Sequence, residues 1–547
     1  MVRKSLLVLA LLLPTTVFAQ LVETIEVRIT NLDVVVTDAS GRPVTGLTQD
    51  DFVVVENGKE QPVTNFYEIR GTAGKGEAPD AAPEVPPAVA KRRIVVFVDN
   101  YTIHPLARNQ AFAALEKSMS QIIRDGDEAM IVFWNRGLEI VAPFTSDRAE
   151  LLRRFRAAAK ESSGGMSLET TRTRILNHAS QMLADAAAPS QNKISVPRAY
   201  NESIASARDF AEEVYAIEVQ MLGDLSRMIG TLAGVEGKKA MIFLGAELPD
   251  QPGLEVFQQI DALFRGHMRI DRPAFFREGG KRSLGADMRK VARQANANGV
   301  TMYMVDTANR SRRNDPTEGM VDASADFFAQ TNTPIAMSTI AAITGGVSVA
   351  GGKSFEQALG TISDDLSSYY SLGYRSPDAG EGNRNVEVRV KRDGLRVRSR
   401  STYIARTPEE DVRERVIANV FHASVKSDFD IDVVAGKPER QADGQFRLPL
   451  TIHFPSSMTL IPQDGQLAGE FAVYIATGTD TGSVSEVTKN VQPMKFPAGS
   501  EKAILDMKTF TYQAALLVRE GEQFVSVAVV DSVAGSAGFA REKVTAK

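Results

Sequence analysis

The chain has 547 residues, a length that predicts roughly three to four domains. Hydrophobic residues make up 43% of it and charged residues 24%, which excludes a disordered, collagen-like or polytopic membrane protein. The formal net charge of −5 gives no electrostatic basis for nucleic acid as a partner. Cysteine is absent, which excludes disulfides and thiolate metal sites, and five histidines do not predict a histidine-rich metal centre.

The first residues have the organisation of a secretory signal peptide. A positive n-region with Arg3 and Lys4 precedes an apolar stretch that Pro14 ends. Small residues up to Ala19 then mark a cleavage site directly after Ala19. The apolar stretch is shorter than the about 20 residues that span a bilayer. We therefore expect residues 1–19 to be removed and the mature protein to be exported to the periplasm or the extracellular space, with no transmembrane segment.

The N-terminal part of the mature chain is predicted to be rich in β-strands. Residues 20–70 contain strand candidates separated by turns, among them Asn57-Gly58 in a hairpin, and we expect a small β module that is part of a sandwich. Residues 71–90 hold four prolines together with glycine and alanine and lack periodicity. This composition predicts an extended linker.

Residues 91–376 have the pattern of a doubly wound, mostly parallel α/β sheet. Continuous apolar runs are typical of strands that are buried on both faces. Such a run occurs at Ile94–Val98, and further strands are predicted at Ala129–Trp134, Leu138–Phe144, Met241–Leu244 and Val300–Val305. Helical segments alternate with them, as in α/β folds, and the strand SSYYSLGY is expected to finish this domain.

Two long segments interrupt the α/β rhythm. Residues 165–235 contain only helical periodicity, and from Phe210 to Leu232 apolar residues recur at spacings of three and four, which predicts a helical insertion with one stripe of core packing. Residues 250–285 are interpreted as an irregular connection whose charged residues form a solvated surface.

The remaining chain is predicted to form β structure. Residues 377–406 are expected to form a β-hairpin extension around Asp393-Gly394. Residues 428–547 alternate in hydrophobicity and carry regularly spaced turn signals, which predicts a C-terminal domain like a β-sandwich.

The α/β segment resembles a von Willebrand factor type A domain. The resemblance is carried by RRIVVFVDN, an amphipathic helix and RDGDEAMIVFWNRGLEIVAPFTSDRAELLRRF, in that order. The later TIAAITGGVSVAGGKSFEQALGTISDDLSSYYSLGYRS is similar to the end of such domains in secreted bacterial VWFA-related (acidobacterial-type) proteins, which also carry an N-terminal segment like TNLDVVVTDASGRPVTGLTQDDFVVVENG. The resemblance covers roughly residues 24–404 and implies a Rossmann-like fold.

The resemblance also implies a place for a metal-ion-dependent adhesion site, in which hard oxygen ligands hold Mg²⁺. Of the five ligand positions, only Asp99 matches. Tyr101 and Ile103 stand where the family has serines, Met166 where it has threonine and Gly245 where it has aspartate. We therefore expect a degenerate site that binds no cofactor and no metal ion, Mg²⁺ included. Asp99 is the one residual metal candidate, and its expected role is structural, as a hydrogen-bond acceptor.

An altered site is the alternative for the same loops. Thr102, Ser167 and Glu247 lie near the degenerate positions in the sequence and carry oxygen atoms. Such a set would supply hard ligands of the kind that Mg²⁺ prefers.

The sequence favours a secreted, noncatalytic protein-interaction function. Ligands of open α/β sheets bind at the carboxyl ends of the strands, so an unidentified protein partner is expected to dock there. The candidate contact residues in these loops are Asp99, Tyr101, Thr102, His104, Arg136 and Glu247.

Two other functions were weighed. Gly346-Val347-Ser348-Val349-Ala350 resembles a nucleophile elbow, so a secreted serine hydrolase is one alternative, although His422 and His453 fall outside the α/β domain. A structural envelope or assembly protein whose β domains bind is the other.

Overall fold

The computed structural model describes residues 29–70, 91–103, 105–161, 163–188, 194–245, 248–307, 336–349, 355–376, 382–422, 425, 427–479 and 483–547. The expected signal peptide and the expected linker at 71–90 lie outside these residues. In the part of the chain that the structure describes, no helix combines the length and the apolar character needed to cross a bilayer.

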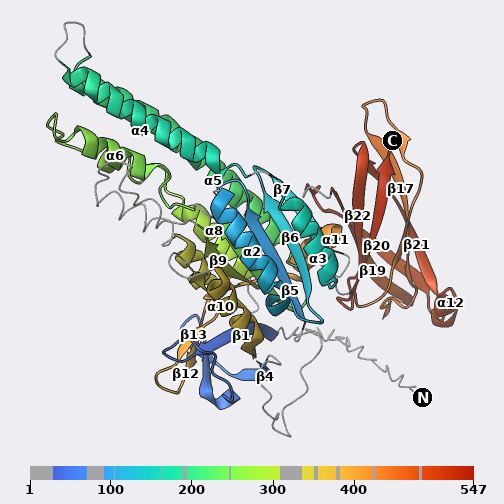
Figure 1. Cartoon of the computed structure of the whole chain (residues 1–547). Coiled ribbons are helices and arrows are strands. Elements are labelled where there is room, and N and C mark those ends of the chain that lie inside the picture. Colours follow the sequence, from blue (N-terminus) through green and yellow to red (C-terminus); the bar gives the residue numbers. More distant parts are fainter. Residues whose placement is uncertain are drawn as a thin grey trace, which may run out of the picture.

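A six-stranded mixed sheet lies at the centre of the molecule, in the order β10-β9-β8-β5-β6-β7 (Figure 1). Its strands are β5 (Arg92–Asp99), β6 (Glu128–Trp134), β7 (Leu138–Thr145), β8 (Lys238–Gly245), β9 (Val300–Asp306) and β10 (Ser348–Val349). All neighbours are parallel except β7, which runs antiparallel to β6. Every residue of β5 and β8 is buried, as their continuous apolar runs predicted, so the chain has the expected mixed α/β character.

Helices cover both faces of this sheet (Figure 1). One face packs on α2 (Pro105–Ile122), α3 (Arg148–Ala158) and α10 (Phe355–Ser367), and the other on α5 (Val196–Gly230) and α8 (Gly285–Ala297). Successive side chains of a strand point to opposite faces. Val96 and Val98 of β5 therefore join the first core, and Val95 and Phe97 join the second.

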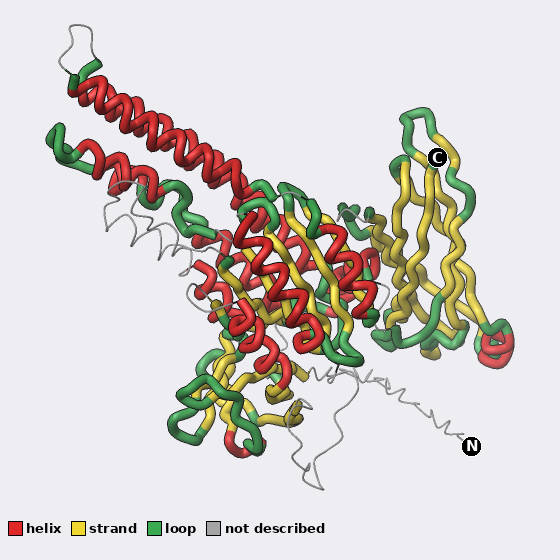
Figure 2. The backbone as a smooth tube through the Cα atoms, viewed as in Figure 1, coloured by secondary structure: helices red, strands yellow, loops and turns green. Residues whose placement is uncertain are grey.

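A helical arm projects from the sheet domain as a long rod (Figure 2). It consists of α4 (Gly165–Ala187) and the first half of α5, against which α6 (Leu254–Phe264) and α7 (Ala274–Glu278) pack. Within it, the Asp261 carboxylate accepts hydrogen bonds from the Tyr200 hydroxyl at 2.6 Å and from the backbone N–H groups of Ala274 and Phe275. One buried acid therefore ties α5 and α6 to the first turn of α7.

The segment 250–285 corrects an expectation. We interpreted it as an irregular, solvated connection, but it contains α6 and α7, and Glu278 and Arg282 are buried. Glu278 is paired with Arg208, Lys281 and Arg282. Burial alone would raise the pKa of Glu278, but hydrogen bonds from Arg208 and Lys281 lower it to about 2. The charged residues suggested exposure, because a partner such as Arg208, 70 residues from Glu278, cannot be recognised in the local sequence.

Two distant parts of the chain form one N-terminal sandwich. Its sheets have the orders β13-β1-β11-β4 and β14-β12-β2-β3, and apolar side chains of both sheets form a common core. The strands are β1 (Ile29–Thr37), β2 (Phe52–Glu56), β3 (Lys59–Gln61), β4 (Val63–Arg70), β11 (Ser368–Arg375), β12 (Gly382–Val390), β13 (Arg396–Arg398) and β14 (Thr402–Ala405), with a 3-10 turn, η1 (Gln49–Asp51). We expected the SSYYSLGY strand, β11, in the α/β domain, but it pairs with β1 and β4.

The C-terminal domain consists of two further sheets that share a core. One contains β15 (Asp432–Ala435), β16 (Glu439–Arg440), β17 (Phe446–Pro455) and β21 (Thr509–Val518). The other contains β18 (Ile461–Gln463), β19 (Gln466–Gly478), β20 (Thr488–Pro497), β22 (Gly521–Asp531) and β23 (Ala537–Ala546). A short helix, α12 (Glu501–Asp506), precedes β21.

One helix that the sequence analysis did not predict, α11 (Pro408–Phe421), joins this domain to the sheet domain. Its apolar face packs on β19 and β22. On its other side, the backbone of Arg415 approaches Gly234 so closely that a Cβ there would lie 2.8 Å from the Arg415 Cα. The Thr407 and Glu410 side chains form a capping box, and Pro408 occupies the first turn, which is a sequence signal for a helix start.

Candidate functional site at the carboxyl edge of the sheet

Three strands end side by side at the edge where ligands of open α/β sheets bind. Asp99 ends β5 opposite Trp134 of β6, and on the other side Val98 is opposite Leu244 of β8. The chain passes from β5 outward to β7 and returns to β8 on the other side of β5. The loop after Asp99 therefore lies at the point where the strand order reverses.

The Asp99 carboxylate is satisfied by its own loop. Asp99 is fully buried, and its Oδ2 accepts a hydrogen bond of 2.7 Å from the Thr102 hydroxyl. Its Oδ1 accepts bonds of 3.2 Å from the backbone N–H groups of Tyr101 and Thr102. This aspartate turn fixes the loop backbone immediately after the strand.

Tyr101 closes the space beside that turn. Its ring packs edge-on against Trp134, with 5.9 Å between centroids, and the guanidinium of Arg136 lies 5.5 Å from the ring centre. The ring also lies against Gly164 at the start of α4, because a Cβ at that glycine would be 2.5 Å from Tyr101 Cδ2. The Tyr101 ring therefore fills the space where the loop after β5, the sheet and the helical arm meet.

Helix α5 holds the loop after β6 in place. The Trp134 indole donates a hydrogen bond of 2.8 Å to Asp224, which is also paired with Arg227. Gln220 donates a bond of 2.8 Å to the backbone carbonyl of Arg136. The sequence analysis missed Trp134, Asp224 and Gln220. The position of the chain's single tryptophan at the end of a strand was the available signal.

The structure divides the predicted contact residues into three groups. Tyr101 is half-buried and Arg136, whose φ is 62°, is exposed, and together they form what we call the carboxyl-edge surface. Asp99 and Thr102 are buried and bonded to each other, which corrects their assignment as contact residues. His104 and Glu247 lie outside the described residues.

The residues present do not fit a magnesium shell. Where the resemblance places an aspartate, a side chain on Gly245 would meet the Phe243 ring at 2.6 Å. Met166 is half exposed and offers only a thioether, which is a poor ligand for a hard cation. Within the described ranges, no group of three or more histidine, aspartate or glutamate side chains is arranged to hold a metal ion.

The two histidines that follow Ser348 in the chain lie away from it. Ser348 lies on β10, whereas His422 contacts Phe144 of β7, at the other edge of the sheet. Five strand spacings correspond to about 24 Å, whereas a nucleophile and its base must lie within hydrogen-bond reach. His453 bonds to Thr511 within the C-terminal domain, so neither histidine that follows Ser348 in the chain serves it.

Comparisons with known proteins do not assign a family. No family model matches the chain, and no curated protein matches it. A Northeast Structural Genomics Consortium target, SoR45, is 12% identical over 22% of this chain and 88% of its own, with a TM-score of 0.15. An aerotolerance-related membrane protein from Bacteroides fragilis is 8% identical over 50% of this chain and 98% of its own, with a TM-score of 0.20. Neither likeness is high enough to carry an argument.

Proposed function

We propose that this protein is an exported, noncatalytic interaction protein of the von Willebrand factor type A kind, which binds a protein partner through the carboxyl-edge surface without a metal ion. The observation that carries the proposal is the closed Asp99 turn. Its carboxylate is used internally, while beside it the exposed Arg136 lies over the half-buried ring of Tyr101. Tyrosine and arginine are the residue types that most often anchor protein interfaces.

The type A assignment is supported by topology together with the sequence motifs. The sheet order, with β5 central and the antiparallel strand at one edge, is that of a doubly wound fold. Helices on both faces complete this arrangement. Export is supported by the signal-peptide pattern of residues 1–19.

The docking proposal is tested by site-specific photocrosslinking in the source cells. A photoreactive amino acid replaces Arg136, and in a matched control it replaces Arg153, which is exposed on α3 away from this edge. We expect one protein to crosslink at position 136 and not at 153. The same protein should be lost from affinity purifications with Arg136→Glu and retained with Arg153→Glu. Equal crosslinking at both positions would overturn the docking site.

Metal independence is tested separately by calorimetric titration of residues 20–547 with Mg²⁺ and Mn²⁺. The closed turn predicts no saturable binding by the wild-type chain. Saturable binding that disappears in Asp99→Asn would overturn this part of the proposal, because it would show that the turn opens to accept a cation.

A further inference from the structure

A cavity of about 350 Å³ lies at the amino edge of the sheet, opposite the carboxyl-edge surface. It lies where the first residues of β8 and β9 meet the N-terminal sandwich. Its charged lining residues are Asp33, Glu236, Lys238, Lys239 and Arg400. We call it the seam cavity, and its chemistry is independent of the proposed partner docking.

Two of the cations border the same open space. Gly299 lines the cavity with φ 64° and has no side chain to fill it. A Cβ at Gly299 would lie 3.5 Å from Nη1 of Arg400 and 3.8 Å from Cε of Lys239. The two side chains therefore converge on the region that Gly299 leaves open.

The cations of the seam cavity lack a carboxylate partner within the part of the chain that the structure describes. Lys239 donates to the carbonyl of Val235 at 2.9 Å, and Arg400 donates to the carbonyls of Asn31 and Asn296. The Lys238 ammonium lies 3.3 Å from the centre of the Tyr369 ring. These direct partners are neutral, and the charge of Asp33, which also lines the cavity, acts favourably on all three cations without an ion pair between described atoms.

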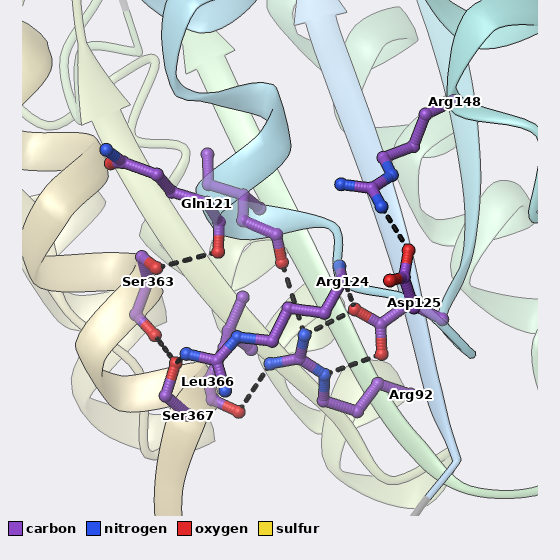
Figure 3. A network of polar contacts seen from close by, with 10 residues as sticks. Arg92, Gln121, Arg124, Asp125, Arg148, Ser363, Leu366 and Ser367 are labelled. Carbon is purple, nitrogen blue, oxygen red and sulfur yellow. Dashed lines mark hydrogen bonds and ion pairs between the residues drawn. The ribbon is translucent and has the colours of Figure 1, made fainter. Parts of the chain in front are cut away.

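Neighbouring cations at the same edge are neutralised instead. Arg92, which is opposite Lys238 in the sheet, donates a hydrogen bond of 2.7 Å to Asp127. It also donates to the carbonyl of Leu366 at the end of α10 (Figure 3). Arg398 makes two hydrogen bonds, of 2.6 and 2.7 Å, to Asp365. The seam cavity therefore differs from its surroundings in having cations without paired acids.

The two acids that line the cavity are outnumbered by its three basic side chains. Glu236 is exposed, and the half-buried Asp33 acts on the three cations through its charge. Burial, together with the positive charges of Arg400 and Arg406, lowers the pKa of Lys239 to about 7. Burial likewise lowers the pKa of Lys238 to about 8. Mutual repulsion of this kind is relieved when an anion enters.

We propose that the seam cavity is a binding site for a phosphate group, either as inorganic phosphate or on a small phosphorylated molecule. A bound phosphate favours the charged form of Lys239, which then supplies a point charge, and Arg400 supplies directed N–H donors of the kind that match phosphate oxygens. Ser371 and Thr301 also line the cavity and add hydroxyl donors. The volume falls in the range of small-molecule sites.

The first test is calorimetric titration of the full chain with inorganic phosphate at pH 7. We expect saturable binding that weakens at least about tenfold in Lys239→Gln and in Arg400→Gln, since each loses a charge-assisted contact. Arg396→Gln is the matched control, because Arg396 is exposed on β13 and lies outside the cavity. Absence of binding by the wild-type chain, or equal weakening in the control, would overturn the proposal.

The second test needs no variant and so does not depend on folding. An amine-reactive acylating reagent at pH 8 should modify Lys239, and the modified peptide can be quantified by mass spectrometry. Millimolar phosphate should slow the modification of Lys239 severalfold but leave exposed Lys290 unchanged, relative to chloride at matched ionic strength. Equal rates with phosphate and with chloride would contradict the site. A free phosphorylated metabolite that protects better than inorganic phosphate would identify the larger ligand as the natural one.

Discussion

At the scale of single residues, the contact of Tyr101 with Gly164 determines how the arm meets the sheet. Gly164 has ordinary helical dihedral angles, φ −81° and ψ −10°. Glycine is therefore needed at this position because there is no room for a side chain, and not because of the backbone conformation. We predict that Gly164→Ala destabilises the protein by about 1–3 kcal/mol, the usual cost of overpacking. Urea unfolding followed by the fluorescence of Trp134, which touches the same ring, measures this.

Gly137→Ala is the control for this prediction, because Gly137 has no atoms within 4 Å of its Cβ position. The double variant Tyr101→Ala/Gly164→Ala should lose less stability than the sum of the single variants, since removing the ring removes the clash. Strict additivity would contradict the proposed contact.

His422 makes a prediction about pH. Burial, and after it the charges of Arg541 and Arg93, lowers the pKa of His422 from 6.5 to about 3. The folded state therefore resists protonation. The contribution of His422 to stability is fully present above pH 6.5. As the pH drops from 6.5 toward 3, the unfolded state takes up a proton that the folded state does not, and the folding equilibrium constant falls by up to about tenfold per pH unit.

Replacement of this histidine should remove that dependence. His422→Asn should show a flatter stability profile than the wild type between pH 6.5 and 3, measured by urea unfolding at each pH. His178→Asn, at an exposed position on α4, should follow the wild type. Identical slopes for all three proteins would refute the buried, neutral state of His422.

At the scale of elements, α11 depends on its N-terminal cap. The Thr407 hydroxyl accepts a hydrogen bond from the N–H of Glu410 at 3.1 Å, and the Glu410 carboxylate accepts one from the N–H of Thr407 at 2.9 Å. We predict that Thr407→Ala costs about 1 kcal/mol. Thr407→Ser, which keeps the hydroxyl, should cost much less. Comparable losses in chemical denaturation would contradict the capping role.

Elements that depend on local sequence patterns were predicted, whereas those that depend on contacts between distant segments were not. The apolar stripe from Phe210 to Leu232 predicted part of α5, because helical periodicity is a local property. The buried runs of β5 and β8 were equally readable. The segment 250–285 was misread because one of the partners of Glu278, Arg208, comes from α5, 70 residues away.

At the scale of the whole molecule, the N-terminal sandwich makes the folding of residues 29–70 and 368–405 interdependent. β11 lies between β1 and β4, and β12 pairs with β2. We predict that a chain starting at residue 91 exposes both edges of β11 and associates, as unpaired strands do. Size-exclusion chromatography measures this.

A chain starting at residue 29 is the control, because it retains all of β1 and should remain dispersed. If the chain starting at residue 91 eluted like this control, β11 would not need its N-terminal partners. The interdependence of the two segments would then be wrong.

The candidate site was readable in part. Asp99, Tyr101 and Arg136 were identified because they follow strand ends, and parallel strands place those ends at one edge. Which of them remain exposed was not readable. The hydrogen bond from Thr102 takes up the Asp99 carboxylate, and α5 fixes the loop of Arg136 through Gln220, from 84 positions away in the sequence.

The sequence by itself determined the mixed α/β character, the buried strands and the residue types in the loops after them, because these depend on residue type and short-range periodicity. The tertiary structure decided the partners of β11, the burial of Asp99 and the convergence of Lys239 and Arg400 on the seam cavity. Such features arise where segments separated by many residues meet. Pairing, burial and net charge at those places are properties of the contacts and not of either segment alone.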